Sequence, residues 1–421
     1  MKTKLQTEQH EILAVQQVES IDLNNGHKDL LIKFYPLETA LLAPASEEYQ
    51  SWKQLFGNDT NSKIDQNPDH LIHMIPNLQE SHPGQQGHLM LCILAGKTIA
   101  AGILLPKTFN TKSIIKLELS RLVHGYYLCG NRFIIEQKHE QDKTLQKDLL
   151  EFALSFCQKQ KVAFLLLEDL FIDQPLNRSI PVSTDRFLIY SHTGFQNRSL
   201  IKFPDTPSDY WNQFRSKSRT KHRRRLRQNS DMHLLRITEP DQVADFLEAA
   251  HRISLNTWQT QRFGLRIKND DLELEELTSL AINNSLRSYL LMKDDAPVAF
   301  KVGYQHNGVF RDLEFGFDRD YAKTSPGEAL LLLILEDLTQ HNTPATYDFG
   351  EGDAEYKQRY SSEITQSRSI LLLPPTIKSR CFLNYLSTSR FINRFLRKTL
   401  KVTGVHTAVR QFFRYGKTGS K

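Results

Sequence analysis

The sequence predicts a mixed α/β fold built from two similar halves, each with a mixed, mostly antiparallel sheet flanked by helices. One order of elements, three strands followed by a helix and a buried strand, starts near residue 89 and again near residue 288. The length of 421 residues suits two units of roughly 100–200 residues each. A composition of 39% hydrophobic and 24% charged residues excludes a disordered or collagen-like chain.

Residues 1–35 are expected to form an N-terminal extension, and residues 36–205 the first half. An aromatic-containing helix begins near Ala43 and leads into a polar loop. Two apolar, β-type runs on either side of Gly96-Lys97 predict a hairpin. The elements expected from there on are strands over 89–94, 99–105 and 114–123, a helix over 143–158 and a buried strand over 162–167.

Residues 206–375 are expected to form the second half. The chain enters it through a proline-containing loop, a basic helix over 215–227 and a helix near 243–258. The repeated order follows, with strands over 288–292, 298–304 and 309–317, a helix over 327–338 and a buried strand over 346–349. After Pro374-Pro375 the composition changes abruptly, and residues 376–421 form a basic, helical C-terminal tail.

The net charge of +6 is distributed unevenly. Eight basic residues and no acid lie in 215–227, and eleven basic residues and no acid lie in 376–421, so the rest of the chain carries a net charge of −13. In the tail, Phe391, Phe395 and Leu400 fall on one helical face among basic residues. This pattern suits either an anionic membrane surface or a helix packed on the domain.

Targeting and metal-binding patterns are missing from the sequence. The longest aliphatic run, 329–335, is far short of the roughly 20 apolar residues that a membrane span needs, and the N-terminus lacks the apolar stretch of a signal peptide. We therefore expect a cytoplasmic protein. No C-x-x-C pair is present, so the four cysteines are expected to be buried thiols, and the histidines do not cluster at ligand spacing, so no metal is expected.

A candidate anion site lies at the start of the 327–338 helix. Ser325 followed by Pro326 and by Glu328 three residues on predicts a capping box. The free N–H groups of such a helix attract a diphosphate, and Gly327 has no side chain to obstruct it. Lys323 adds a cation just upstream. The alternative is a well-capped core helix with no ligand.

Two further segments carry candidate catalytic residues. Glu314 lies in the strand before this helix, where partial burial would raise its pKa into the range of a general base, although a strand carboxylate often simply faces solvent. The strand after the helix ends in Asp348 and passes through two glycines to Tyr356 and Lys357. Beside that lysine, Tyr356 is a candidate proton donor with a lowered pKa; the alternative is a solvated turn.

These motifs resemble those of the acetyltransferase-like proteins of the CelD/BcsL type, in the GNAT superfamily and related to the FemAB aminoacyltransferases. The resemblance covers roughly residues 40–370 and includes the segments 214–227 and 296–300. The matching residues of its core motifs are Ser325, Pro326, Gly327, Leu330, Asp348, Phe349, Gly350, Gly352, Asp353, Tyr356 and Lys357.

The resemblance implies a tandem GNAT-like fold and direct transfer of an acyl group from acetyl-CoA or another acyl-CoA to an amine of a cell-envelope or polysaccharide precursor. It implies Glu314 as the base and Tyr356 as the acid, with Asp348 as a further catalytic residue. Only the second half is expected to bind the diphosphate of CoA. The expected cofactor contacts are Lys323, Ser325, Gly327, Glu328 and Ala329, and the expected substrate contacts are Asp353, Lys357, Arg219 and Arg223.

Three other functions stay open. FemAB relatives use aminoacyl-tRNA, so tRNA is an alternative donor. A non-catalytic scaffold docked by its tail on the inner membrane would explain the basic C-terminus. The helix over 215–227 also suits a nucleic-acid binder, although few aromatic residues accompany it and DNA is not the expected partner. A small-molecule or lipid-linked amine is the expected acceptor.

Overall fold

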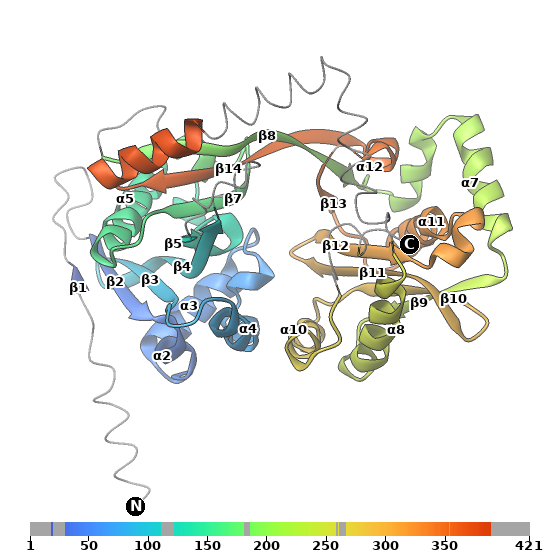
Figure 1. The fold of residues 1–421 in the computed structure, drawn as a ribbon, viewed down its shortest axis with the longest axis horizontal. Helices are drawn as coiled ribbons and strands as arrows, with labels where there is room; N and C mark the ends of the chain where they lie inside the picture. Colours follow the sequence, from blue (N-terminus) through green and yellow to red (C-terminus); the bar gives the residue numbers. More distant parts are fainter. Residues whose placement is uncertain are drawn as a thin grey trace, which may run out of the picture.

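A computed structural model describes residues 18–19, 30–110, 122–180, 186–257, 260, 267–352 and 354–388. Two lobes, each with helices on its sheet, are joined by two long strands that arch from one lobe to the other (Figure 1). All strands belong to one 14-stranded sheet, in the order β1-β2-β3-β4-β5-β7-β14-β8-β13-β12-β11-β10-β9, with β6 paired to β4.

The first half contains the predicted hairpin and helices. Its apolar residues bury one sheet face against α5 and the other against α3 and α4. Its strands are β1 (Val18–Glu19), β2 (Leu30–Pro36), β3 (His88–Leu94), β4 (Lys97–Asn110), β5 (Leu122–Leu128), β6 (Ile134–Ile135), β7 (Leu165–Phe171) and β8 (Leu188–Lys202), and its helices are α2 (Leu37–Leu41), α3 (Glu47–Asn58), α4 (Pro68–Ser81), α5 (Lys143–Lys159) and α6 (Pro175–Ser179).

The second half repeats this arrangement. The apolar helix α11 packs on one face of its sheet, and α8 and α10 pack on the other (Figure 1). Its strands are β9 (Met232–Ile237), β10 (Ser288–Lys293), β11 (Ala296–His306), β12 (Val309–Phe317), β13 (Thr346–Glu351) and β14 (Glu363–Leu373), and its helices are α7 (Ser216–Gln228), α8 (Val243–Leu255), α10 (Asp271–Ile282), α11 (Pro326–Gln340) and α12 (Glu355–Tyr360).

The two halves exchange their last strands. In each half the last long strand before the long helix (α5 or α11) and the strand after it are parallel, β5 with β7 and β12 with β13. The strand that follows β7 in the chain, β8, pairs with β13 of the other half, whereas β14, which follows β13, pairs with β7. β8 and β14 also pair with each other along most of their length. The two sheets are therefore continuous.

Helices provide a second contact between the halves. The side chain of Asn67, at the start of α4, donates to Asn283 Oδ1 over 2.9 Å, and His70 Nδ1 lies 2.9 Å from Ser279 Oγ. Ser62 accepts from Asn307 Nδ2 at both its carbonyl (3.1 Å) and its hydroxyl (3.0 Å). Together with the exchanged strands, these bonds fix how the halves face each other.

Several sequence expectations need correction. The third strand of the first half is β5 at Leu122–Leu128, later than the predicted 114–123, most of which lies outside the described residues. Cys92, Cys129 and Cys157 are buried, but Cys381 is exposed on a helix over 377–388. That helix packs Phe382, Leu383 and Leu386 on the first half. The amphipathic segment 391–400 lies outside the described residues, and the boundaries at 35, 205 and 375 remain predictions.

Candidate active site

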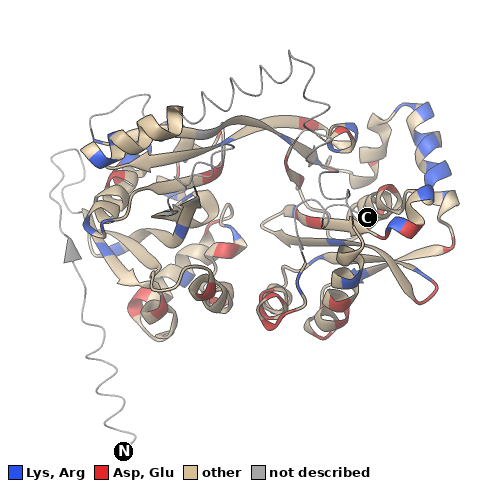
Figure 2. Cartoon of the chain, in the orientation of Figure 1, with Lys and Arg blue, Asp and Glu red and all other residues tan. Residues whose placement is uncertain are grey.

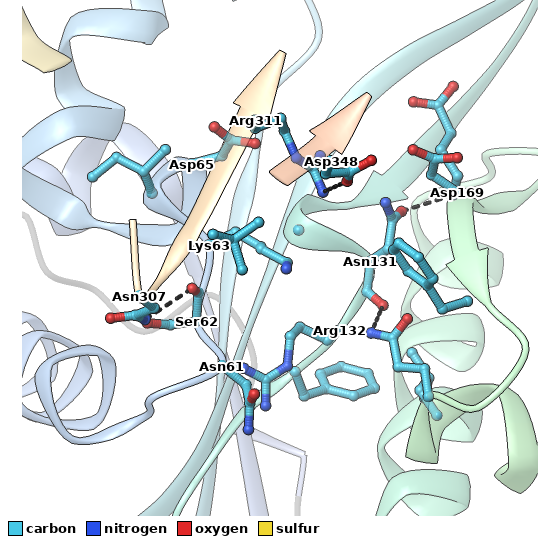
Figure 3. Close-up of a pocket in the computed structure, with 18 of the residues that line it drawn as sticks. Asn61, Ser62, Lys63, Asp65, Asn131, Arg132, Asp169, Asn307, Arg311 and Asp348 are labelled. Atoms are coloured by element: carbon cyan, nitrogen blue, oxygen red, sulfur yellow. Dashed lines mark hydrogen bonds and ion pairs between the residues drawn. The ribbon is translucent and has the colours of Figure 1, made fainter. Parts of the chain in front are cut away.

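A cavity of about 1100 Å³ lies between the two halves, beneath the exchanged strands. The first half contributes the 60–65 loop, residues 130–133 and the end of β7, and the second half contributes residues of β11, β12 and β13 (Figure 3). Sites for small molecules usually measure roughly 300–1,000 Å³, so this cavity can hold a large polar ligand. Sequence reasoning assigned no function to the 60–65 loop.

The 60–65 loop is held by buried hydrogen bonds. Trp52 Nε1 donates to the carbonyl of Gln66 over 3.0 Å, and Gln66 Nε2 donates to the carbonyls of Cys129 (3.1 Å) and Arg132 (2.9 Å). Gly130 has a φ of 69°, and a Cβ there would lie 2.7 Å from the Gln66 side chain. This position therefore favours glycine for its backbone conformation and for the close packing of Gln66.

Lys63 extends from this loop into the cavity (Figure 3). Among the described residues its ammonium group has no hydrogen bond or ion pair, whereas the neighbouring Arg132 is paired with Asp59 over 2.8 Å. Burial, together with repulsion from Arg311 and Arg132, lowers the pKa of Lys63 to about 8. An anionic ligand group would relieve this repulsion.

Asp348, predicted to be catalytic, is the anchor of a buried ion-pair network. Its two oxygens accept from Arg198 Nε (2.8 Å) and Nη2 (2.7 Å), and Oδ1 also accepts from the N–H of Gly350 (2.9 Å). Arg311 Nη2 lies 3.7 Å from Oδ2. Although burial alone would raise it, the pKa of Asp348 is held below its ordinary value by Arg198. This geometry favours a positioning role over proton transfer.

Glu314 lies just after a β-bulge. In the pairing with β11, Arg311 lies opposite Tyr304 and Glu314 lies opposite Val302, so Leu313 is the extra residue of the bulge. Because of this extra residue, Glu314 lies on the same face of the sheet as Arg311, and Arg311 lines the cavity. Tyr356 lies close to this bulge. Burial, with the carboxylates of Asp312 and Glu314, raises the pKa of Tyr356 well above its usual range. The predicted lowering by Lys357 is therefore wrong, because the nearby charges are acidic.

The start of α11 differs from the predicted capping box. Ser325 has left-handed backbone angles and makes no side-chain cap, and the N–H groups of Glu328 and Ala329 donate instead to its carbonyl, over 3.1 and 3.3 Å. The Glu328 carboxylate accepts from Arg225 Nε (3.0 Å), which joins α11 to α7. The capping-box prediction fails because Ser325 lacks the extended backbone of an N-cap and because this arginine binds the Glu328 carboxylate.

The other predicted cofactor contacts differ in their exposure to solvent. Lys323 is exposed, whereas Ala329 is fully buried in the core. A Cβ at Gly327 would lie 2.5 Å from Phe315 Cζ and 3.3 Å from Phe317 Cδ1. Close packing of α11 on β12 therefore already requires this glycine, whether or not a diphosphate binds.

The predicted substrate contacts lie on different elements of the structure. Lys357 Nζ donates to the carbonyls of Phe349 and Glu351, each over 2.7 Å, and so closes the turn after β13. Arg223 is exposed on α7 and Arg219 is half-buried there, while Asp353 lies outside the described residues. Figure 2 shows Lys and Arg gathered along α7. The described residues contain no group of three or more potential metal ligands and no helix long and apolar enough to cross a membrane.

Comparisons with known proteins agree with this architecture. Residues 216–358 match the family model described as the acetyltransferase (GNAT) domain. The structure is similar to that of FemX, with a TM-score of 0.54 and 11% identity over 79% of this chain and 98% of that chain. A protein of unknown function from Bacteroides thetaiotaomicron gives a TM-score of 0.48 at 13% identity (77% and 97% covered). A tandem GNAT protein from the clavulanic acid biosynthesis pathway gives a TM-score of 0.42 at 10% identity, over 82% of this chain and 99% of that chain. A comparison with curated proteins found no match.

The fold and the matched domain support a GNAT-type acyltransferase. The second half carries the GNAT domain, and 79% of the chain shares the fold of FemX. The predicted fold class and superfamily are therefore confirmed, while the CelD/BcsL type remains a prediction.

Because Gly327 packs closely against Phe315, replacing it should affect stability even when no ligand is bound. Gly327→Ala should lower the free energy of unfolding by about 1–3 kcal/mol, because the added methyl overlaps Phe315. Adding Phe315→Leu should restore part of this loss in a urea denaturation series. Gly57→Ala, in α3 with nothing within 4 Å, is the matched control and should not destabilise. A Gly327→Ala protein as stable as the wild type would contradict the packing explanation.

Asp348→Asn should destabilise the protein by about 3–5 kcal/mol at pH 7, since Arg198 would remain buried without its bidentate partner. Because the pKa of Asp348 is lowered on folding, the wild type should lose this contribution only as the pH falls below the ordinary Asp value of about 3.9. Denaturant unfolding at several pH values tests both points. Glu363→Gln, an exposed carboxylate of the same cavity, should change stability by less than about 0.5 kcal/mol; equal effects of the two variants would refute the assignment.

Proposed function

We propose that this protein is an N-acyltransferase that moves an acyl group from acyl-CoA directly to an amine. The match of residues 216–358 to the GNAT domain carries this proposal, because that segment contains both Glu314 and Tyr356. The proximity of Tyr356 to the β12 carboxylates Asp312 and Glu314 supports it. The donor is expected at the α11 end of the second half, where Lys323 is exposed.

The chemistry needs two proton movements. Glu314 would accept a proton from the amine as its nitrogen attacks the thioester carbonyl, and Tyr356 would give its proton to the departing thiolate. Since the pKa of Tyr356 is raised, the phenol keeps its proton at neutral pH until that step. No covalent enzyme intermediate is required.

The acceptor is proposed to bind in the cavity between the halves. Lys63 and Arg311 place two positive charges there, one from each half, which suits an acceptor with a phosphate or carboxylate group. Asn61, Asn131 and Thr346 supply further polar contacts for a sugar or similar polyol. The resemblance to the CelD/BcsL type supports a cell-envelope or polysaccharide precursor as the acceptor class.

Glu314→Gln should lower kcat for acetyl transfer by about 10²–10⁴-fold, because it removes the proton acceptor and keeps the shape of the side chain. Tyr356→Phe should slow thiol release by a similar order. Both can be measured by release of free CoA in the presence of a panel of amines. Asp295→Asn, in the exposed turn between β10 and β11, is the control and should keep wild-type rates. Wild-type rates in both active-site variants would contradict the assigned roles.

A second donor, aminoacyl-tRNA, is favoured by one observation. On α7 the side chains of Arg215, Lys217, Lys221, Arg223, Arg224 and Arg227 are exposed, and α7 is bonded to α11 through Arg225 and Glu328. A large polyanion at the donor site would contact this surface.

The charge of α7 distinguishes the two donors. If tRNA is the donor, changing Lys217, Arg224 and Arg227 together to Gln should weaken aminoacyl-tRNA binding and flatten its dependence on salt between 50 and 200 mM. If acyl-CoA is the donor, the triple variant should retain acetyl transfer, and wild-type protein should show no transfer from aminoacyl-tRNA. Paired assays with the two donors decide between them.

A further inference from the structure

The strand after the long helix of each half, β7 or β13, contains a β-bulge with an acid in it or directly after it. On β7, Leu167 pairs with Ile370 and Leu170 with Arg368, so Glu168 and Asp169 together oppose the single residue Ser369 of β14. Asp169 has a φ of 57°, a left-handed conformation that is uncommon for residues other than glycine. Bulges next to active sites commonly redirect a side chain.

The matching irregularity in the second half lies at the end of β13. Asp348 pairs with Leu200 and Glu351 with Arg198, so Phe349 and Gly350 together oppose Ser199 of β8. Gly350 has a φ of 71°, which turns the chain sharply before Glu351. Asp169 and Glu351 thus come from corresponding strands of the two halves, and both line the same cavity.

The two acids meet beside Arg198. Asp169 accepts hydrogen bonds from Arg198 Nη1 and from Ser367 Oγ, the latter over 3.0 Å, and its carboxylate is hydrogen-bonded to Glu351. The other charged groups around Glu351 are Asp348, which is paired with Arg198, and Lys357, which binds the main-chain carbonyl of Glu351.

Two hydrogen-bonded carboxyl groups share a proton, because an ionised pair would repel. Arg198 holds the pKa of Asp169 below its ordinary value, although burial alone would raise it. The hydrogen bond to Asp169, with partial burial, raises the pKa of Glu351 to about 7. Glu351 remains exposed to the cavity, so a ligand can reach its proton.

We propose that the Asp169–Glu351 pair is a proton acceptor of the interdomain cavity and takes a proton from an ammonium group of the acceptor when it binds. This inference rests on the proposed N-acyl transfer. An ammonium group loses two protons on becoming an amide. The pair, once it has lost its shared proton to solvent, would take the first, leaving a neutral amine, and would then release that proton to solvent. Glu314 would take the second during attack, while the thiolate receives its proton from Tyr356.

The shared proton can be tested without any activity assay. In protein with ¹³C-labelled Asp and Glu carboxyl groups, an NMR titration of the full chain should show Glu351 titrating near pH 7, assigned by its loss in Glu351→Gln. Asp169→Asn should return this titration to the ordinary Glu range of about 4.3. Titration of Glu351 near pH 4 in the wild type would overturn the shared proton.

The catalytic role requires a pH–rate profile with acetyl-CoA and an amine acceptor. In the wild type kcat/KM should rise with pH through about 7, as the pair loses its proton. In Glu351→Gln this rise should be absent, and kcat/KM should be lower than in the wild type. Glu47→Gln, the same change at an exposed position of α3 outside the cavity, should keep the wild-type profile. An unchanged profile in Glu351→Gln overturns the role of the pair alone, whereas absence of acyl transfer in the wild type with either donor overturns the proposed function and this role together.

Discussion

The buried guanidinium of Arg198 is the interaction on which the joined architecture depends. Arg198 lies on β8, is 2% exposed, and binds Asp348 of β13 and Asp169 of β7. A buried charge of this kind is tolerated only when it is fully paired. Because its partners come from different halves, the pairing is complete only when both halves and the exchanged strands are in place. The same network forms one wall of the cavity and sets the position of Arg311 and Glu351.

The proposed active site follows from this shared construction. The GNAT domain of the second half supplies Glu314 and Tyr356, while the first half supplies the Lys63 loop and Asp169. The bulge at Leu313 returns Glu314 to the sheet face that lines the cavity through Arg311. An acceptor in the cavity and a donor at the α11 end would therefore approach β12 from two sides, which suits direct transfer without a covalent enzyme intermediate.

Local patterns in the sequence predicted the elements whose burial is local. The strand at 309–317 and the apolar helix of 326–340 follow from runs of residues that any packed sheet would bury. The strand exchange was not predictable, because pairing of β8 with β13 and β14 with β7 joins residues more than a hundred positions apart. For the same reason Lys63, Arg198 and Asp169 were missed: each is an ordinary polar residue in the sequence, and only the fold brings them together. The capping box failed for two reasons that the sequence does not reveal: Ser325 has left-handed backbone angles, and a distant residue, Arg225, binds the Glu328 carboxylate.

In the proposed reaction the second half binds an acyl-CoA for transfer to an acceptor in the cavity. Calorimetric titration of the full chain with acetyl-CoA tests it most directly, with free CoA as the companion ligand. We expect saturable binding of both at one site per chain, still present in Lys63→Met, because this lysine belongs to the proposed acceptor site. Absence of saturable binding by the folded wild type would contradict acyl-CoA as the donor.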